Sequence, residues 1–142
     1  MTIGAALRNH LLADAQIAAI VGTRLFPLRL PQKVVLPAIV LTRISEVRYG
    51  HLRGNEALAR PRYQVDCWAT THDGATALGT LVRQRLNGYT GTWTDTDSPS
   101  STIPVTVLFD SAQDLFDPDI LGGACRHMSE YFVWHGTANG AV

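Results

Sequence analysis

The sequence predicts an α+β fold, with a largely antiparallel sheet of four to five strands and two helices packed on one face. Three observations predict it. Residues 62–69 alternate between apolar and polar side chains, as a strand does. The residues directly after them change to apolar spacings of three and four, which is a helical stripe. Two further stretches, 103–109 and 125–135, return to the alternating pattern.

The N-terminal segment, residues 2–20, predicts the first helix. Ile3, Leu7 and Leu11 recur every four residues, and a second short turn continues to Val21 before Gly22 stops it. Residues 25–26 begin a short extended piece that lies next to prolines. Because proline lacks the amide that a central strand needs, this piece should be a sheet edge or a loop.

Residues 38–47 predict a strand, since they are rich in β-branched side chains. Residues 48–59 contain two glycines and no sustained period, so we expect a long hairpin loop leading to the strand at 62–69. A loop of this length exceeds what closure of a hairpin requires, which makes it a candidate contact arm.

The strand at 62–69 and the helix after it define the expected core. Tyr63, Val65 and Cys67 share one strand face, and the helical stripe should pack on it; the stripe is Ala75, Leu78, Leu81, Val82 and Leu86. Thr71 can cap this helix, and Asn87-Gly88 can end it. The opposite face carries Trp68, with Phe132 and Trp134 as further candidates. Such an aromatic face would be exposed unless a partner covers it.

The C-terminal part alternates strands with turns. Residues 90–102 are mostly Thr, Ser, Asp, Gly and Pro, which predicts a flexible connection. The strand at 103–109, a turn cluster at 117–123 and a final strand at 125–135 follow. The tail, residues 136–142, is small and polar, and we expect it to be frayed. The domain prediction is one domain over residues 1–142.

Composition excludes several classes of protein. Hydrophobic residues make up 46% of the chain, too many for a disordered protein. No apolar run approaches the length of a membrane span, and the N-terminus lacks the basic and apolar regions of a secretory signal. We interpret the two cysteines as buried thiols in a reducing compartment.

Charge is balanced but unevenly placed. Twelve basic and twelve acidic residues cancel, which argues against a protein that wraps nucleic acid through bulk charge. Arginines concentrate in residues 43–62, whereas residues 110–119 hold four aspartates and no cation. Separated patches of opposite sign suit self-association or docking to other subunits, although ordinary solvated loops would also give this pattern.

The motifs of catalysis and metal binding do not occur in the sequence. The glycines are in the wrong context for a phosphate or dinucleotide site, and no zinc or calcium spacing is present. Cys67 with His72 resembles a thiol and base, but Cys67 should point into the core. His127 and His135 are roughly 27 Å apart at strand rise, too far to share a metal. We therefore predict no enzyme, no cofactor and no metal site.

The arginine-rich region is instead interpreted as a subunit interface. Arginine is favoured at interfaces, whereas nucleic-acid stacking platforms need more aromatic residues than the single tyrosine present there. The candidate interface residues are Arg43, Arg48, Tyr49, His51, Arg53, Arg60, Arg62 and Trp68.

Five segments, in the same order, resemble the tail-completion, or tail-terminator, proteins of long-tailed bacteriophages and gene transfer agents. They are the N-terminal helix with the segment 21–27, the strand start at 36–41, the run Tyr-Gln-Val-Asp-Cys-Trp-Ala at 63–69, the Ala/Leu helix ending in Arg-Leu-Asn-Gly at 85–88, and the final strand ending Tyr-Phe-Val-Trp-His at 131–135.

The resemblance implies a structural virion protein, made in the host cytoplasm, at the head–tail joint. Proteins of this family form a ring, usually of six subunits, on the head-proximal end of the tail tube. The implied partners are further copies of the chain, the tail tube protein and the head-completion or connector protein. DNA would pass through the ring without specific binding, and no membrane is involved. The alternatives are another component of the joint, such as a head-completion or stopper protein, and a small monomeric ligand-binding domain.

Overall fold

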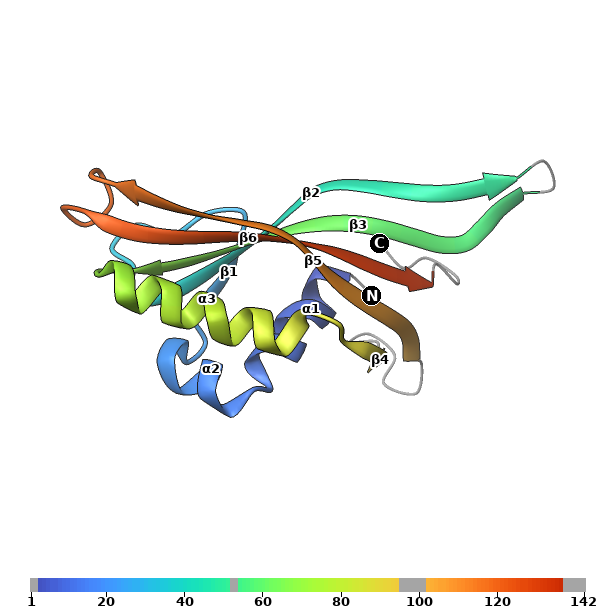
Figure 1. Ribbon diagram of the computed structural model, residues 1–142, viewed down its shortest axis with the longest axis horizontal. Helices are drawn as coiled ribbons and strands as arrows, with labels where there is room; N and C mark the ends of the chain where they lie inside the picture. The colour runs from blue at the N-terminus through green and yellow to red at the C-terminus, as the bar shows by residue number, and fades with distance from the viewer. Residues whose placement is uncertain (1–2, 52–53, 95–101, 137–142) are drawn as a thin grey trace.

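The computed structural model describes the backbone of residues 3–51, 54–94 and 102–136, and the side chains of these except for residues 50–57 (Figure 1). Within this part of the chain lie three helices and six strands. The helices are α1 (Ile3–Leu12), α2 (Ala15–Val21) and α3 (His72–Leu86). The strands are β1 (Leu25–Pro27), β2 (Ala38–His51), β3 (Gly54–Ala69), β4 (Thr90–Thr94), β5 (Thr102–Asp117) and β6 (Ala124–Gly136).

The six strands form one sheet in the order β1-β2-β3-β6-β5-β4. β1 pairs parallel with β2 and all other pairs are antiparallel, so the sheet is mixed. The α+β class is confirmed, and four of the five strand pairs are antiparallel. The described chain has six strands rather than the predicted four to five, and three helices rather than two. The prolines do confine β1 to an edge, as expected.

β4 is the strand that composition concealed. Thr90–Thr94 lies inside the segment 90–102 that was predicted to be a flexible connection, and it pairs with Thr102–Thr106 of β5. Trp93 anchors it, because its side chain is buried in the main core beside His10 and Tyr89. Burial of this one tryptophan stabilises a strand among residues that otherwise favour turns. Residues 95–101 lie outside the described residues.

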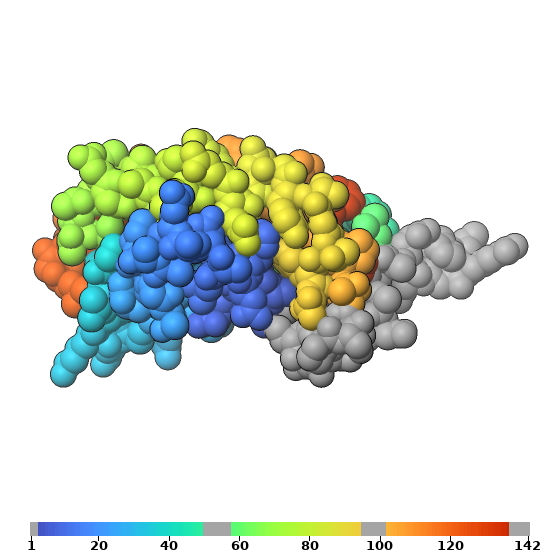
Figure 2. Space-filling model, turned by 90° about the horizontal axis from the view of Figure 1, so that it is seen from below, coloured from blue at the N-terminus to red at the C-terminus, as the bar shows by residue number. Residues whose placement is uncertain are grey.

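The three helices cover one face of the sheet, as Figures 1 and 2 show. The predicted first helix is in fact two, because Asp14 interrupts it. The Oδ1 atom of Asp14 accepts hydrogen bonds from the backbone amides of Gln16 at 2.9 Å and Ile17 at 3.2 Å. These bonds make Asp14 the N-cap of α2. An N-cap residue has non-helical backbone angles, so Asp14 ends one helix and begins the next.

α3 begins and ends where the sequence predicted. Thr71 Oγ1 accepts a hydrogen bond from the Gly74 amide at 3.1 Å, and Asn87 is the C-cap. Gly88 then takes φ 75°, in the region that favours glycine. Gly79 allows close contact with the sheet, since a Cβ there would lie 2.1 Å from Cδ2 of His127.

The main core lies between the helices and the sheet. Cys67 is fully buried there, with Val65, Leu78 and Val82, as the two periodicities predicted. Burial raises the pKa of the Cys67 thiol. Cys125 is only half-buried, and both thiols are free.

The predicted loop at 48–59 is wrong: it is the outer half of a long hairpin. β2 runs to His51 and β3 begins at Gly54, with pairing up to their junction. Register shifts between Arg43 and Ser45 and between Arg48 and Gly50 break the alternation, which explains why no period is visible in the sequence. We call residues 43–51 and 54–62 the arm; it extends beyond the helices (Figure 1). Residues 137–142 of the expected tail lie outside the described residues.

Candidate subunit interface

The structure divides the predicted interface residues among three places. Tyr49, Arg60 and Arg62 lie on the face of the arm that no helix covers, here called the open face. Arg43 and Arg48 lie on the opposite, helix-side face. Trp68 is on the open face but at the other end of β3. The side chain of His51 and the whole of Arg53 lie outside the described residues.

Arginines and aromatic rings alternate on the open face. The Arg60 guanidinium lies 4.8 Å from the ring centre of Phe132 and 5.3 Å from that of Trp134. Tyr49 stacks on Trp134 with ring centres 5.7 Å apart and planes 10° apart. Arg62 lies 5.4 Å from the Phe132 ring. We call these five side chains the arginine–aromatic row. Such stacking orders long side chains before any partner binds.

Carboxylates hold the inner end of this row. Arg62 donates hydrogen bonds to Glu130 and, at 2.6 Å, to Oδ2 of Asp110. The hydrogen bond to Glu130 is the main cause of the raised pKa of Arg62. Two carboxylates therefore balance the charge of Arg62. Arg60, in contrast, lies against the rings of Phe132 and Trp134.

Apolar side chains on the same face remain exposed around the row. Val47 is 40% exposed and Leu108 is 46% exposed, and Leu58 belongs with them. Pairing places Val47 opposite Arg60, and Leu108 opposite Phe132. Aromatic, arginine and aliphatic groups on one face are the residue types enriched at protein interfaces.

The helix-side group is a smaller charged cluster. Glu46 Oε2 lies 2.8 Å from Arg48 Nε, and Glu46 Oε1 lies 3.8 Å from Arg43 Nη1. His135 is buried beside them, and burial lowers its pKa. This cluster is solvent-facing at its arginines, so exposed ion pairs here add little to stability.

Trp68 is on the predicted face, but its predicted exposure was wrong. It is only 7% exposed, because Leu30 and Leu36 from the β1–β2 connection and Ile120 from the β5–β6 turn cover it. Arg126 lies 5.5 Å from its ring centre. Trp68 is therefore part of a second, small core rather than of the exposed surface.

An ion pair between the buried Asp66 and the partly exposed Arg126 lies beside Trp68. Asp66 Oδ1 lies 3.2 Å from Arg126 Nε, and Gln64 donates a hydrogen bond of 2.8 Å to Asp66 Oδ2. Burial raises the pKa of Asp66, while the bonds from Gln64 and Arg126 act in the opposite direction. Gln64 and Arg126 are thus the partners of this carboxylate within the chain.

Sequence reasoning missed the residues of β6 and β5 that complete the open face. Phe132 and Trp134 were candidates for this face but not for the interface, and Glu130, Asp110 and Leu108 were not associated with Arg62. The alternation of 125–135 places Glu130, Phe132 and Trp134 on one side. Only the register of β6 against β3 shows that this side carries the arginines.

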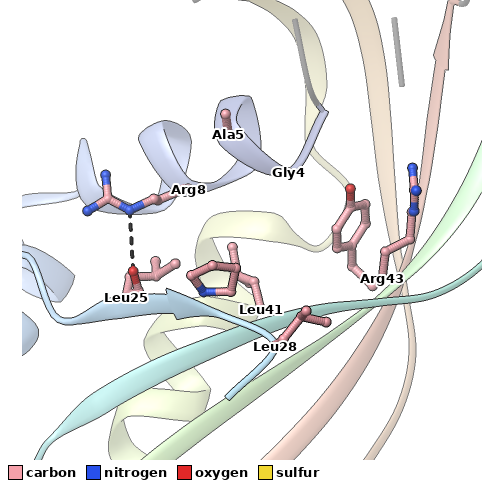
Figure 3. A pocket seen from close by; sticks show the side chains of 9 residues that line it. Gly4, Ala5, Arg8, Leu25, Leu28, Leu41 and Arg43 are labelled. Atoms are coloured by element: carbon pink, nitrogen blue, oxygen red, sulfur yellow. Dashed lines mark hydrogen bonds between the residues drawn. The ribbon is translucent and has the colours of Figure 1, made fainter. Parts of the chain in front are cut away.

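A pocket opens between α1 and the sheet edge, with a volume of about 440 Å³ (Figure 3). Arg8 donates a hydrogen bond from Nε to the Leu25 carbonyl at 3.3 Å across it. Its other walls include Leu28, Leu41 and Tyr63. Among its described lining residues the polar side chains are two arginines and one tyrosine, without the nucleophile and base that hydrolytic chemistry requires.

The thiol–base pairing considered from sequence does not form. Cys67 is in the core, whereas His72 Nε2 lies 3.2 Å from Asp114 Oδ2 at the start of α3. His127 Nδ1 lies 2.6 Å from the other oxygen of Asp114, and these two contacts, that with His127 first, lower the pKa of Asp114. No cluster of three metal-ligating side chains occurs among the residues described. Nor does that part of the chain contain a helix long and apolar enough to cross a membrane.

Residues 5–129 match the family model described as tail completion protein gp17. The chain belongs to this family. As a tail completion protein it belongs to a family of structural virion proteins of phage tails. Its fold is also that of a chain in a solved structure titled "Virion of native gene transfer agent (GTA) particle", with a TM-score of 0.71 and 17% identity over 93% of this chain and 92% of that chain. A comparison with curated proteins gives no match.

Proposed function

We propose that this tail completion protein is a tail terminator: it forms a hexameric ring on the head-proximal end of the finished tail tube. The ring stops tube polymerisation and presents a surface to the head-completion or connector protein. Family membership over residues 5–129 is the observation that carries this proposal. The exposed arginine–aromatic row gives it a physical basis, since a monomer would leave this face in water.

The mechanism is steric. A tube grows because each ring of tube protein offers the next ring a template. A terminator that occupies the last template with one face, and offers a different surface on the other, removes the site of further addition. No turnover is needed, and the fold fits this role with a rigid sheet and a projecting arm.

DNA passes through the centre of such a ring and must not be held there. Each phosphate neutralised by a basic side chain would add sequence-independent affinity and slow ejection. Arg62 is already paired with Glu130 and Asp110, and Arg60 is stacked on rings. The net charge of zero agrees with a channel that does not bind DNA tightly.

The test is removal of the gene from a phage or gene transfer agent that carries it. Loss of a terminator gives tubes of uncontrolled length that do not join heads, and adding the purified protein to growing tubes restores a defined length. Electron micrographs measure both. Tubes of normal length beside heads that lack tails would contradict the terminator role.

That second outcome would support the alternative within the same joint, a head-completion or stopper protein, which acts on the head side. The pocket beside Arg8 supports the other alternative, a monomeric ligand-binding domain. Light scattering of the protein mixed with tail tubes separates these: the terminator assembles on the tubes, whereas a monomeric binding domain stays free.

A further inference from the structure

Each edge of the sheet has one half that pairs with no described strand. We call these two stretches the half-edges. On one side, β1 pairs only with Ile39–Leu41 of β2, and beyond β1 the Leu28 amide donates a hydrogen bond to the Leu41 carbonyl at 2.9 Å. On the other side, β4 and the residues before it cover β5 only as far as Phe109, whose amide bonds Asn87 Oδ1 at 3.1 Å. Within the described chain, β2 beyond Arg43 and β5 beyond Asp110 thus offer unpaired backbone groups.

These half-edges lie at opposite ends of the sheet. The free half of β2 is in the arm, and the free half of β5 ends at the β5–β6 turn, at the far end in Figure 1. A neighbour in the same orientation, shifted along the strands, would bring its free β5 beside the free β2 of the first copy. The shift carries β1 of one copy and β4 of the other away from the contact, so neither strand blocks it.

The strand directions agree with this contact. β2 runs towards the tip of the arm and β5 runs away from that end, because both are antiparallel to strands of the same sheet. In two copies of equal orientation they are therefore antiparallel, like most pairs in this sheet. The regular stretches Ser45–Arg48 and Ser111–Asp117 lie between register shifts and turns and contain no proline, which would prevent ladder bonds.

The side chains on the two half-edges match on both faces. When a sheet continues into a neighbour, open face joins open face. On that face β2 carries Val47, 40% exposed, and β5 carries Leu115, 37% exposed. On the helix side β2 carries Arg48, and β5 carries Asp114. Aliphatic groups therefore meet aliphatic groups, and arginine meets aspartate.

We infer that neighbouring copies of this chain join by strand addition, with Ser45–Arg48 of β2 pairing antiparallel with the segment Ser111–Asp117 of β5 in the next copy. The contact joins two different edges, so it is head-to-tail, the kind of contact that repeats into a ring when the rotation between copies closes. The inference deepens the proposed terminator function and rests on its ring. It also explains why the basic and acidic segments of the sequence lie on opposite edges.

Cysteine cross-linking tests this pairing. Val47→Cys is combined with a second cysteine on the open face of β5, at Ser111, Gln113 or Leu115 in turn. Cross-strand neighbours on one face have Cβ atoms close enough for a disulfide. Mild oxidation of protein assembled on tail tubes should convert most of the chain of at least one double variant into dimers and larger ladders on denaturing gels.

The matched controls combine Val47→Cys with Ala112→Cys or Phe116→Cys, which lie on the helix side of β5. They, the single variants and the unvaried protein with its two native thiols should stay monomeric on the same gels. Equal cross-linking of open-face and helix-side pairs would contradict the inference, which requires the open faces of the two copies to adjoin.

Assembly is measured in the same samples by electron microscopy, so the two proposals can fail separately. Rings on tubes without cross-links in any open-face pair overturn strand addition and leave the terminator function standing. Cross-linked ladders that do not cap tubes support strand addition and contradict the terminator function. Protein that neither assembles nor cross-links overturns both.

Discussion

The two ends of β3 experience opposite surroundings although they belong to one strand. At Val65–Trp68 both faces are buried, one by α3 and the other by the β1–β2 connection and Ile120. At Arg60–Arg62 the open face meets only water and side chains of the neighbouring strands. The covered end stabilises the domain, whereas the open end is available for partners. Changes at matched positions in the two ends should therefore act on different properties.

The largest difference is expected between two aspartate substitutions. Cys67→Asp places an unpaired charge in the core and should cost about 3–5 kcal/mol in the free energy of unfolding. Leu108→Asp, on the open face, should cost less than about 1 kcal/mol. Urea denaturation of both variants measures this. Similar losses would show that the open face is covered within the monomer.

The two tryptophans of the open face give the next test. Trp68→Ala removes a ring from the second core and should cost about 3–5 kcal/mol in unfolding free energy. Trp134→Ala, which loses contacts with Tyr49 and Arg60, should cost about 1–2 kcal/mol by the magnitude of such stacking pairs. The order should reverse for assembly on tail tubes, which Trp134→Ala should weaken more. Thermal melts and co-sedimentation decide, and a larger stability loss for Trp134→Ala would contradict the comparison.

Gly79 tests the close contact between α3 and the covered end. In an open helix a glycine to alanine change stabilises by about 1 kcal/mol. Here the new Cβ meets the His127 ring, so Gly79→Ala should destabilise the fold by about 1–3 kcal/mol. The exposed neighbour Ala77 is the control. Ala77→Gly should lower the free energy of unfolding only by the difference in helix propensity between the two residues. Combining Gly79→Ala with His127→Ala should remove the clash penalty, and a stabilised single variant would show that the ring lies elsewhere.

The pH dependence of stability should show contributions from two buried histidines, His10 and His135. Burial lowers the pKa of His10 in α1 and of His135 in β6, beside the arm, below the ordinary 6.5. Between these lowered pKa values and 6.5, the unfolded chain binds more protons than the folded chain, so stability falls as pH decreases through this window. The double variant His10→Gln/His135→Gln should flatten the curve of melting temperature between pH 7.5 and about 5. A curve that keeps its full slope would contradict the assignment.

The smallest expected effect concerns DNA. Because the open-face arginines are engaged by rings and carboxylates, the isolated protein should bind duplex DNA negligibly at about 150 mM salt, by the usual dependence on phosphate contacts. Arg60→Ala should change this little. Tight binding in fluorescence anisotropy, with a steep salt dependence that Arg60→Ala reduces, would make the arm a DNA-contacting element.

Local patterns in the sequence were sufficient for the covered half of the fold. The alternation of Tyr63, Val65 and Cys67, and the stripe of α3 with its caps, depend on residues close in the chain, so strand, helix and buried face could be predicted together. The order of segments also indicated the family, which the match over residues 5–129 confirms. What lay outside these patterns was set by contacts between distant residues.

Tertiary structure alone decided the arm, β4 and the state of Trp68. Register shifts hide the period of 43–51, and the hairpin is formed by pairing between β2 and β3, with β6 beside β3 as far as Leu58. One buried ring, Trp93, orders a polar strand. Trp68 is covered by the β1–β2 connection, and no local pattern in that connection predicts where it runs. Alternation along a strand assigns each side chain to a face, but only packing of the whole chain determines which faces are covered.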